Sequence, residues 1–389
     1  METDIILLFG QTGLGKNECG RKLAAQLLGL SLNKYPCAFL SLEDEIIAGS
    51  KSPNFSLHFY LSGYNLDKQR KEWKAAAERI LSRIKSEKPL YCVLALHATY
   101  FFSSHFKTFV ESEFIRELNP RVAFTLINDI YYIKDRIDKN PKNRAHRVNL
   151  TCKDILTWRS VECMVADSIV NNSGVNGLHN YIISTKQALK TYCDIIEKPD
   201  RKKAYLSFPI THIRDKESCR AIIDEVRFFL HKNFTCFDPL GIDEKRLFDE
   251  GEGKYVVKKC WPFGLDGCLC DENGGDGITT LEPEAGLENI GRIIDNHIVY
   301  RDYRLIDQSD CLIICRPFSS IVGIEGKKGL SPGVWNEVKY AQNVDKPVFL
   351  MDDIVTDPDS AESPFDNIQG VEYVTSFEEL EAVLASLQT

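Results

Sequence analysis

A glycine-rich stretch near the start of the chain has the residue types that bind phosphate. Gly10-Gln-Thr-Gly-Leu-Gly-Lys16 follows an apolar run and precedes a helical pattern. Glycines let the backbone wrap so that its N–H groups point at phosphate oxygens, and the lysine adds a positive charge at the start of the helix. A glycine turn with a surface lysine is the alternative. The candidate phosphate ligands are Gly10, Gly13, Gly15, Lys16 and Asn17.

The residues expected to complete this site raise the question of a metal. Asn17 stands where Ser or Thr usually offers a hydroxyl to Mg²⁺, which favours phosphate binding over metal-dependent transfer. Asp129 follows an apolar run and would hold a nucleotide-bound Mg²⁺, or would instead cap the helix from Ile130. Three arginines, Arg136, Arg144 and Arg147, would close over phosphates or form a solvated loop. The expected cofactor is ATP or another nucleoside triphosphate with Mg²⁺.

A second candidate site lies near the C-terminal end of the sequence. Ser331, Gly333 and Glu337 have the spacing S-x-G-x-x-x-E, and apolar residues at helical spacing follow from Val334 to Asn343. A buried strand is predicted on each side, at 311–315 and 348–351. Ligands of parallel sheets bind at the carboxyl ends of strands. Glu337 is therefore expected to face the mouth of a crevice there.

The elements that must position these residues alternate between strands and helices. This alternation predicts an α/β fold with mainly parallel sheets. A charged, proline-containing stretch near 196–203 predicts a boundary between two domains, at 1–198 and 203–389. The second domain carries an irregular insertion at 241–281, with the length of a lid or binding segment. Further strands are expected at 37–42, 90–96, 122–127, 181–184, 204–208, 234–237 and 371–374.

The composition excludes several classes of protein. There is no apolar run of membrane-spanning length, and the net charge of −8 disfavours general binding to duplex nucleic acid. Thirteen cysteines without an export signal indicate reduced thiols and a cytoplasmic location. No metal site is predicted with confidence from the cysteines, because Cys260, Cys268 and Cys270 lack the paired spacing of zinc ligands and would need Cys236 or His297 as a fourth.

Two resemblances bring these patterns together. Residues 4–170, with the glycine loop and loosely placed acids and arginines, resemble adenylate-kinase-like P-loop nucleotide kinases. Residues 204–351 resemble the nucleoside 2-deoxyribosyltransferase family through Tyr205-Leu-Ser207-Phe-Pro209, through Asp302 eight residues before Asp310, and through Ser331, Gly333 and Glu337. Serine at 331, rather than aspartate, resembles the 2′-deoxynucleoside 5′-monophosphate N-glycosidase branch.

The second resemblance implies a flavodoxin- or Rossmann-like fold and a set of roles. Glu337 would be the nucleophile, Asp302 the proton donor or orienting acid, and Tyr205 a further catalytic residue. Ser331, Gly333 and Ser207 would bind the substrate and its 5′-phosphate. An ordinary pKa leaves Glu337 ionised, whereas Asp302 would need burial to raise its pKa. From the residues alone, Asp302 is equally a solvated helix residue, Ser331 an N-cap and Glu337 a surface acid.

Three hypotheses about function follow. The first is an enzyme of nucleotide metabolism that cleaves or transfers the N-glycosidic bond of a (deoxy)nucleoside 5′-monophosphate, with a P-loop domain that binds a nucleoside phosphate. In the second, the P-loop domain senses a nucleotide and gates a nucleotide- or NAD-depleting defence effector. The third is a non-catalytic nucleotide-binding assembly module. The expected partners are a small nucleotide and, from the resemblance, further copies of the chain.

Overall fold

The chain folds into two compact units, each with its own apolar core. The first comprises residues up to 189, three short strands of the later insertion and residues 290–294, and the second comprises 190–244 and 295 onward. Both are α/β with parallel main sheets, as the sequence predicts. The computed structural model describes residues 3–31, 36–50, 55–139, 150–213, 216–244, 247–249, 255–257, 279–281, 290–316, 330–352 and 369–387.

The observed boundary lies ahead of the charged stretch in which the sequence places it. Helix α9 (Leu189–Glu197) belongs almost wholly to the second unit. Arg201 donates to Asp194 of that helix at 3.2 Å, and the Lys203 backbone N–H donates to Asp310 at 2.8 Å. The charged residues between 198 and 203 therefore form a turn that polar contacts fix within the second unit, and this turn is no linker.

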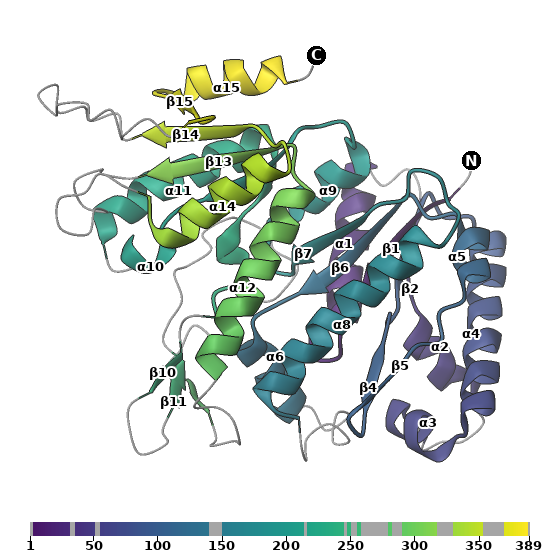
Figure 1. Cartoon of the computed structure of the whole chain (residues 1–389). Coiled ribbons are helices and arrows are strands. Elements are labelled where there is room, and N and C mark those ends of the chain that lie inside the picture. The colour runs from purple at the N-terminus through teal and green to yellow at the C-terminus, as the bar shows by residue number, and fades with distance from the viewer. Residues whose placement is uncertain are drawn as a thin grey trace, which may run out of the picture. The chain divides into compact units, whose positions relative to one another are not determined.

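The main sheet of the first unit is entirely parallel, and its central strand leads into the glycine loop. Its order is β2-β3-β1-β6-β7, with β1 between β3 and β6 (Figure 1). The carboxyl ends of β3 and β6 therefore flank the loop that follows β1. The strands are β1 (Asp4–Phe9), β2 (Cys37–Ser41), β3 (Tyr91–Ala95), β6 (Val122–Ile127) and β7 (Asn180–Ser184).

Seven helices of the described part pack around this sheet. One apolar cluster joins alternate residues of the strands to α4, α5 and α8, as expected for strands whose side chains alternate between faces. A short hairpin of β4 (Tyr100–Phe102) and β5 (His105–Lys107) follows β3. The helices are α1 (Lys16–Leu30), α2 (Leu42–Gly49), α3 (Leu57–Gly63), α4 (Leu66–Glu87), α5 (Ser112–Leu118), α6 (Ile130–Lys139) and α8 (Cys152–Asn171).

The sheet of the second unit has the doubly wound order predicted for a flavodoxin-like domain. Its strands run β15-β14-β13-β8-β9, all parallel, which is the order 2-1-3-4-5 read from the other edge. The chain winds outward from β8 on one side and from β13 on the other, so these neighbours form the switch point. The strands are β8 (Lys203–Ser207), β9 (Thr235–Phe237), β13 (Cys311–Arg316), β14 (Val348–Asp352) and β15 (Glu372–Val374).

The alternation of side chains in β8 decides which residues face the site. Ala204 and Leu206 join the core with α11 (Glu217–Asn233) and α15 (Phe377–Ser386). Tyr205 and Ser207 therefore point to the opposite face, where α14 (Pro332–Asn343) lies (Figure 1). Two further helical elements complete the unit, α10 (Ile210–Ile213) and α12 (Ile290–Asp307), with a 3₁₀ turn at Pro239–Gly241.

Part of the segment predicted to be irregular forms a small antiparallel sheet. Strands β10 (Leu247–Asp249), β11 (Tyr255–Val257) and β12 (Thr279–Leu281) pair in this order. Cys260, Cys268 and Cys270 lie outside the described residues. No helix in the described part of the chain combines the length and apolar character needed to cross a membrane.

Candidate functional site

A cavity of about 330 Å³ opens in the second unit where the predicted site residues meet. It lies beyond the carboxyl ends of β8 and β9 and against the first turns of α14, next to the switch point of the sheet. Its volume falls at the lower end of small-molecule sites. The predicted residues that line it are Tyr205, Asp302, Ser331, Gly333 and Glu337.

Glu337 is held from two sides by hydroxyl groups of β8. Tyr205 Oη donates to Glu337 Oε1 at 3.1 Å, and Ser207 Oγ donates to Glu337 Oε2 in a short hydrogen bond. Residues 205 and 207 share one face of the strand, so β8 presents both hydroxyls to one carboxyl group. Ser207 was expected to bind the substrate and its 5′-phosphate, but its hydroxyl contacts Glu337.

Asp302 is buried beside Glu337 and is paired with an arginine that the sequence analysis did not single out. Arg301 donates from Nε to Asp302 Oδ1 at 2.8 Å and from Nη1 to the Ile242 carbonyl at 3.0 Å. Asp302 also has hydrogen-bond contacts with Glu337 and Tyr205. Asp302 is therefore a buried member of the site and not a solvated helix residue. The sequence signal for Arg301 was its place: it is a cation next to Asp302 within an apolar helical pattern.

The two carboxyl groups share an environment that favours their protonated forms. Burial, and then the nearby Asp302 carboxylate, raise the pKa of Glu337 to about 8, against the opposing effect of the hydrogen bonds from Ser207 and Tyr205. Burial also raises the pKa of Asp302, against the opposing effect of Arg301. The expectation that Glu337 keeps an ordinary pKa is thus wrong, because its carboxyl group is buried next to another acid. Near neutral pH the pair holds a proton, as two close carboxyl groups commonly do.

Ser331 is the N-cap of α14 and also lines the cavity. Its Oγ accepts the Val334 backbone N–H at 3.4 Å, and Pro332 occupies the first turn. Among the described residues, nothing lies within 4 Å of where a Cβ at Gly333 would stand. The helix start therefore offers amide groups to an anion at the mouth of the cavity.

The glycine loop of the first unit has a backbone that needs its glycines. Gly10, Gly13 and Gly15 have φ values of +152°, +92° and +73°. A Cβ on Gly13 would approach Ile137 to 2.8 Å, and one on Gly15 would approach Arg136 to 2.9 Å, so α6 lies directly against the loop. The first turn of α1 has no side-chain cap, which leaves its amide groups for a ligand.

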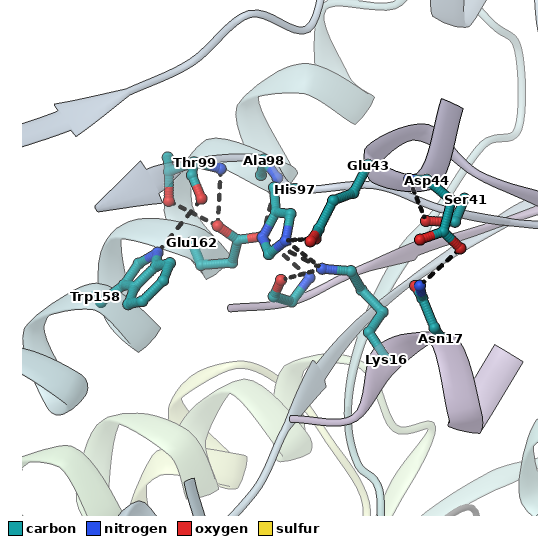
Figure 2. Close-up of polar contacts among 11 residues, drawn as sticks. Lys16, Asn17, Ser41, Glu43, Asp44, His97, Ala98, Thr99, Trp158 and Glu162 are labelled. Atoms are coloured by element: carbon teal, nitrogen blue, oxygen red, sulfur yellow. Dashed lines mark hydrogen bonds and ion pairs between the residues drawn. The ribbon is translucent and has the colours of Figure 1, made fainter. Parts of the chain in front are cut away.

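Lys16 lies in a buried polar cluster built by β1, β3, α2 and α8 (Figure 2). Its Nζ donates to the Gly10 carbonyl at 2.7 Å and lies 3.0 Å from His97 Nε2, whose ring is 3.4 Å from Glu43 Oε2. Burial lowers the pKa of Lys16 to about 8, while Glu162 and Glu43 raise it. His97 is thus a direct neighbour of the loop lysine, because β3 pairs with β1.

Glu162 holds the start of the glycine loop in place, a role that the sequence analysis did not predict. Its Oε1 accepts the backbone N–H groups of Gly10 and Ala98 at 3.0 and 2.9 Å, and its Oε2 accepts the N–H and hydroxyl of Thr99 at 2.8 and 2.6 Å. Both oxygens are therefore fully used. An acid on the buried face of a predicted helix was the only local signal for this role.

The residues expected to hold Mg²⁺ are engaged in other contacts. Asp129 is fully buried and its Oδ2 accepts from Lys186 Nζ at 2.6 Å. The Asn17 amide donates to Asp44 at 3.1 Å, and Arg136 donates to Glu18 at 3.1 Å. Arg144 and Arg147 lie outside the described residues. In the part of the chain that the structure describes, no group of three or more His, Cys, Asp or Glu side chains could hold a metal ion.

Comparisons with known proteins leave the chain without a family. The sequence matches no known protein family and no curated protein. Among solved structures, an uncharacterized protein from Eubacterium ventriosum is 15% identical over 51% of this chain and 98% of its own, with a TM-score of 0.27. An unliganded sugar kinase from Janibacter sp. is 12% identical over 51% of this chain and 92% of its own, with a TM-score of 0.28. An apo GTPase from Pyrococcus abyssi is 12% identical over 46% of this chain and 90% of its own, with a TM-score of 0.22. At these TM-scores the similarities carry no functional argument.

Proposed function

We propose that the second unit cleaves or transfers the N-glycosidic bond of a (deoxy)nucleoside 5′-monophosphate, and that the first unit binds a nucleoside phosphate through its glycine loop. The observation that carries the first part is Glu337, held by Tyr205 and Ser207 beside Asp302 at the edge of a cavity. Paired carboxyl groups around a sugar are the standard means of glycosidic cleavage.

In the proposed reaction, the Glu337 carboxylate attacks the anomeric carbon as the bond to the base breaks, and the departing base takes a proton from Asp302. Water or a second base then displaces the glutamyl ester. Asp243 and Glu244 also line the cavity, so four acids face one arginine there. This excess of negative charge stabilises the oxocarbenium-like sugar of the transition state. The start of α14 would bind the 5′-phosphate.

The protonation state of the pair supports these roles. One proton shared by Glu337 and Asp302 leaves one carboxylate as nucleophile and one acid as donor. Arg301 favours the ionised form of Asp302, so the proton resides on Glu337 in the free enzyme. Proton transfer between the hydrogen-bonded pair then produces the reactive form.

The test is the release of free base from purified protein incubated with a panel of nucleoside and deoxynucleoside 5′-monophosphates. We expect release from at least one of them, and a loss of about 10³-fold or more in Glu337→Ala, since a nucleophile acts only at the reacting centre. Asn336→Ala, on the exposed side of the same helix, is the matched control. Release that survives Glu337→Ala would remove Glu337 from the mechanism.

A second function, in which the first unit senses a nucleotide and gates a nucleotide- or NAD-depleting activity, is favoured by the contacts of Asn17 and Asp129. Neither residue is arranged for metal-dependent transfer, which is consistent with binding without turnover. In this case ATP would change the rate of base release from the monophosphates or from NAD, and Lys16→Ala would abolish that change. An ATP effect that persists in Lys16→Ala would rule out a gate at the glycine loop.

A further inference from the structure

His97 follows the end of strand β3 by two residues, and β3 is the neighbour of the strand that leads into the glycine loop. Strands β3 and β1 are adjacent and parallel, so the residues after β3 lie beside the loop that follows β1. His97 is buried there, and its ring nitrogens lie 3.0 and 3.2 Å from Lys16 Nζ. An imidazole therefore occupies the place next to the lysine where a phosphate ligand and its counter-ion would meet.

The donor set around the loop does not fit the magnesium ion that a P-loop fold implies. Glu162 already accepts four hydrogen bonds, and Asp129 is bound by a lysine. Asp129 is also absent from the groups that influence the pKa of Lys16, whereas Glu162 and Glu43 are among them. Besides waters and phosphate oxygens, a nucleotide-bound Mg²⁺ usually takes one or two protein carboxylates as ligands. The expected Mg²⁺ at Asp129 is thus not supported by this site.

We propose that the first unit binds the phosphate groups of its nucleotide without a divalent metal, with His97 supplying the positive charge that the metal usually provides. This inference rests on the proposed function of the glycine loop. The ligand is then a phosphoryl anion free of Mg²⁺, and His97 binds it together with Lys16.

The charges around His97 explain why the ligand would change its protonation. The groups that face the ring are Lys16 of α1, Glu43 of α2, Glu162 of α8 and the Tyr100 ring, with its centroid 4.8 Å away. Burial, and then Lys16, lower the pKa of His97, so the imidazole of the free protein is neutral at pH 7. A phosphate dianion brings opposite charge to the ring and raises its pKa, so that binding takes up a proton.

A second observation points to a ligand at this loop. The side chain of Gln11, inside the glycine loop, is 2% exposed, and its amide nitrogen has no hydrogen-bond partner among the residues that the structure describes. Buried donors are almost always satisfied in proteins. An additional acceptor, such as a phosphate oxygen held by the loop, would satisfy it.

The experiment is calorimetric titration of the full chain with ATP at pH 7, in EDTA and in excess Mg²⁺, each in two buffers of different ionisation enthalpy. We expect similar affinity with and without the metal, and net proton uptake on binding. His97→Gln should weaken binding by about tenfold, as expected for one charge-assisted hydrogen bond, and should remove most of the uptake. His105→Gln, at an exposed position of the same unit, should change neither quantity.

One further variant keeps the proposal falsifiable if His97→Gln does not fold. His97→Asp restores an acid beside the loop, and its binding should become dependent on Mg²⁺. Binding by the natural chain that vanishes in EDTA and returns with Mg²⁺, or proton uptake unchanged in His97→Gln, would overturn the inference alone. Failure to bind ATP, ADP or GTP under either condition would overturn the proposed function of the loop as well.

Discussion

At the scale of single residues, the chemistry of the second site depends on one proton that Glu337 and Asp302 share. Glu337 and Asp302 are both less acidic than ordinary carboxyl groups, chiefly because the cavity wall removes water from them. The pair loses its last proton near the pKa of about 8 found for Glu337. Above this pH both groups are negative, and the departing base has no acid to protonate it.

The pH dependence of base release follows from this state. We expect kcat/KM to fall tenfold per pH unit above about 8, since it reports the free enzyme and the active pair must retain one proton. Initial rates between pH 5 and 10 at low substrate concentration measure it. A rate that continues to rise above pH 9 would mean that Asp302 does not act as a proton donor.

The same carboxyl group should affect stability without any substrate. Because folding raises the pKa of Glu337, its contribution is full below the unfolded value of 4.5 and is lost as the pH rises through about 8. Glu337→Gln, which is neutral at every pH, should therefore raise Tm at pH 8.5 but not at pH 4. Thermal unfolding at both values provides the measurement, and Glu381→Gln, on the exposed side of α15, is the control.

At the scale of elements, a single serine both begins a helix and borders the cavity. We expect Ser331→Ala to lower the free energy of unfolding by about 0.5–1 kcal/mol, because its N-cap bond is long. It should also raise KM for a 5′-monophosphate more than KM for the corresponding nucleoside. Ser376→Ala removes the N-cap of α15, which accepts Glu379 N–H at 3.1 Å, and should reproduce only the loss of stability. Equal KM effects in both variants would mean that Ser331 is a cap alone.

The elements were the part of the fold that local sequence could predict. Residues 122–127 form the strand expected there, because a short apolar run bounded by polar residues is a local signal. The glycine loop and the Ser331-to-Glu337 spacing are local as well. His97, Glu162 and Arg301 were not assigned to the sites, since their partners are fixed by strand order and by contacts between distant segments.

At the scale of the whole molecule, two separate cores predict two separate unfolding events. Each unit has its own sheet and apolar cluster, so we expect scanning calorimetry of the full chain to resolve two transitions. ATP should raise the transition temperature of the first unit, because a ligand stabilises only the unit that binds it. Glu337→Gln at pH 8.5 should raise the transition temperature of the second unit. A single transition that responds to both would show that the units unfold cooperatively.

The pairing of β8 with β13 has a consequence for how the second unit tolerates change. Tyr205 lies opposite Leu312, so the central ladder of this sheet is closed by about a hundred intervening residues. The entropy lost in closing a flexible loop grows only with the logarithm of its length, so shortening that stretch by forty residues would alter the closure cost by less than about 1 kcal/mol. Segments can therefore be gained or lost between these strands over evolutionary time, while the strand that holds Glu337 through Tyr205 and Ser207 keeps its place in the sheet.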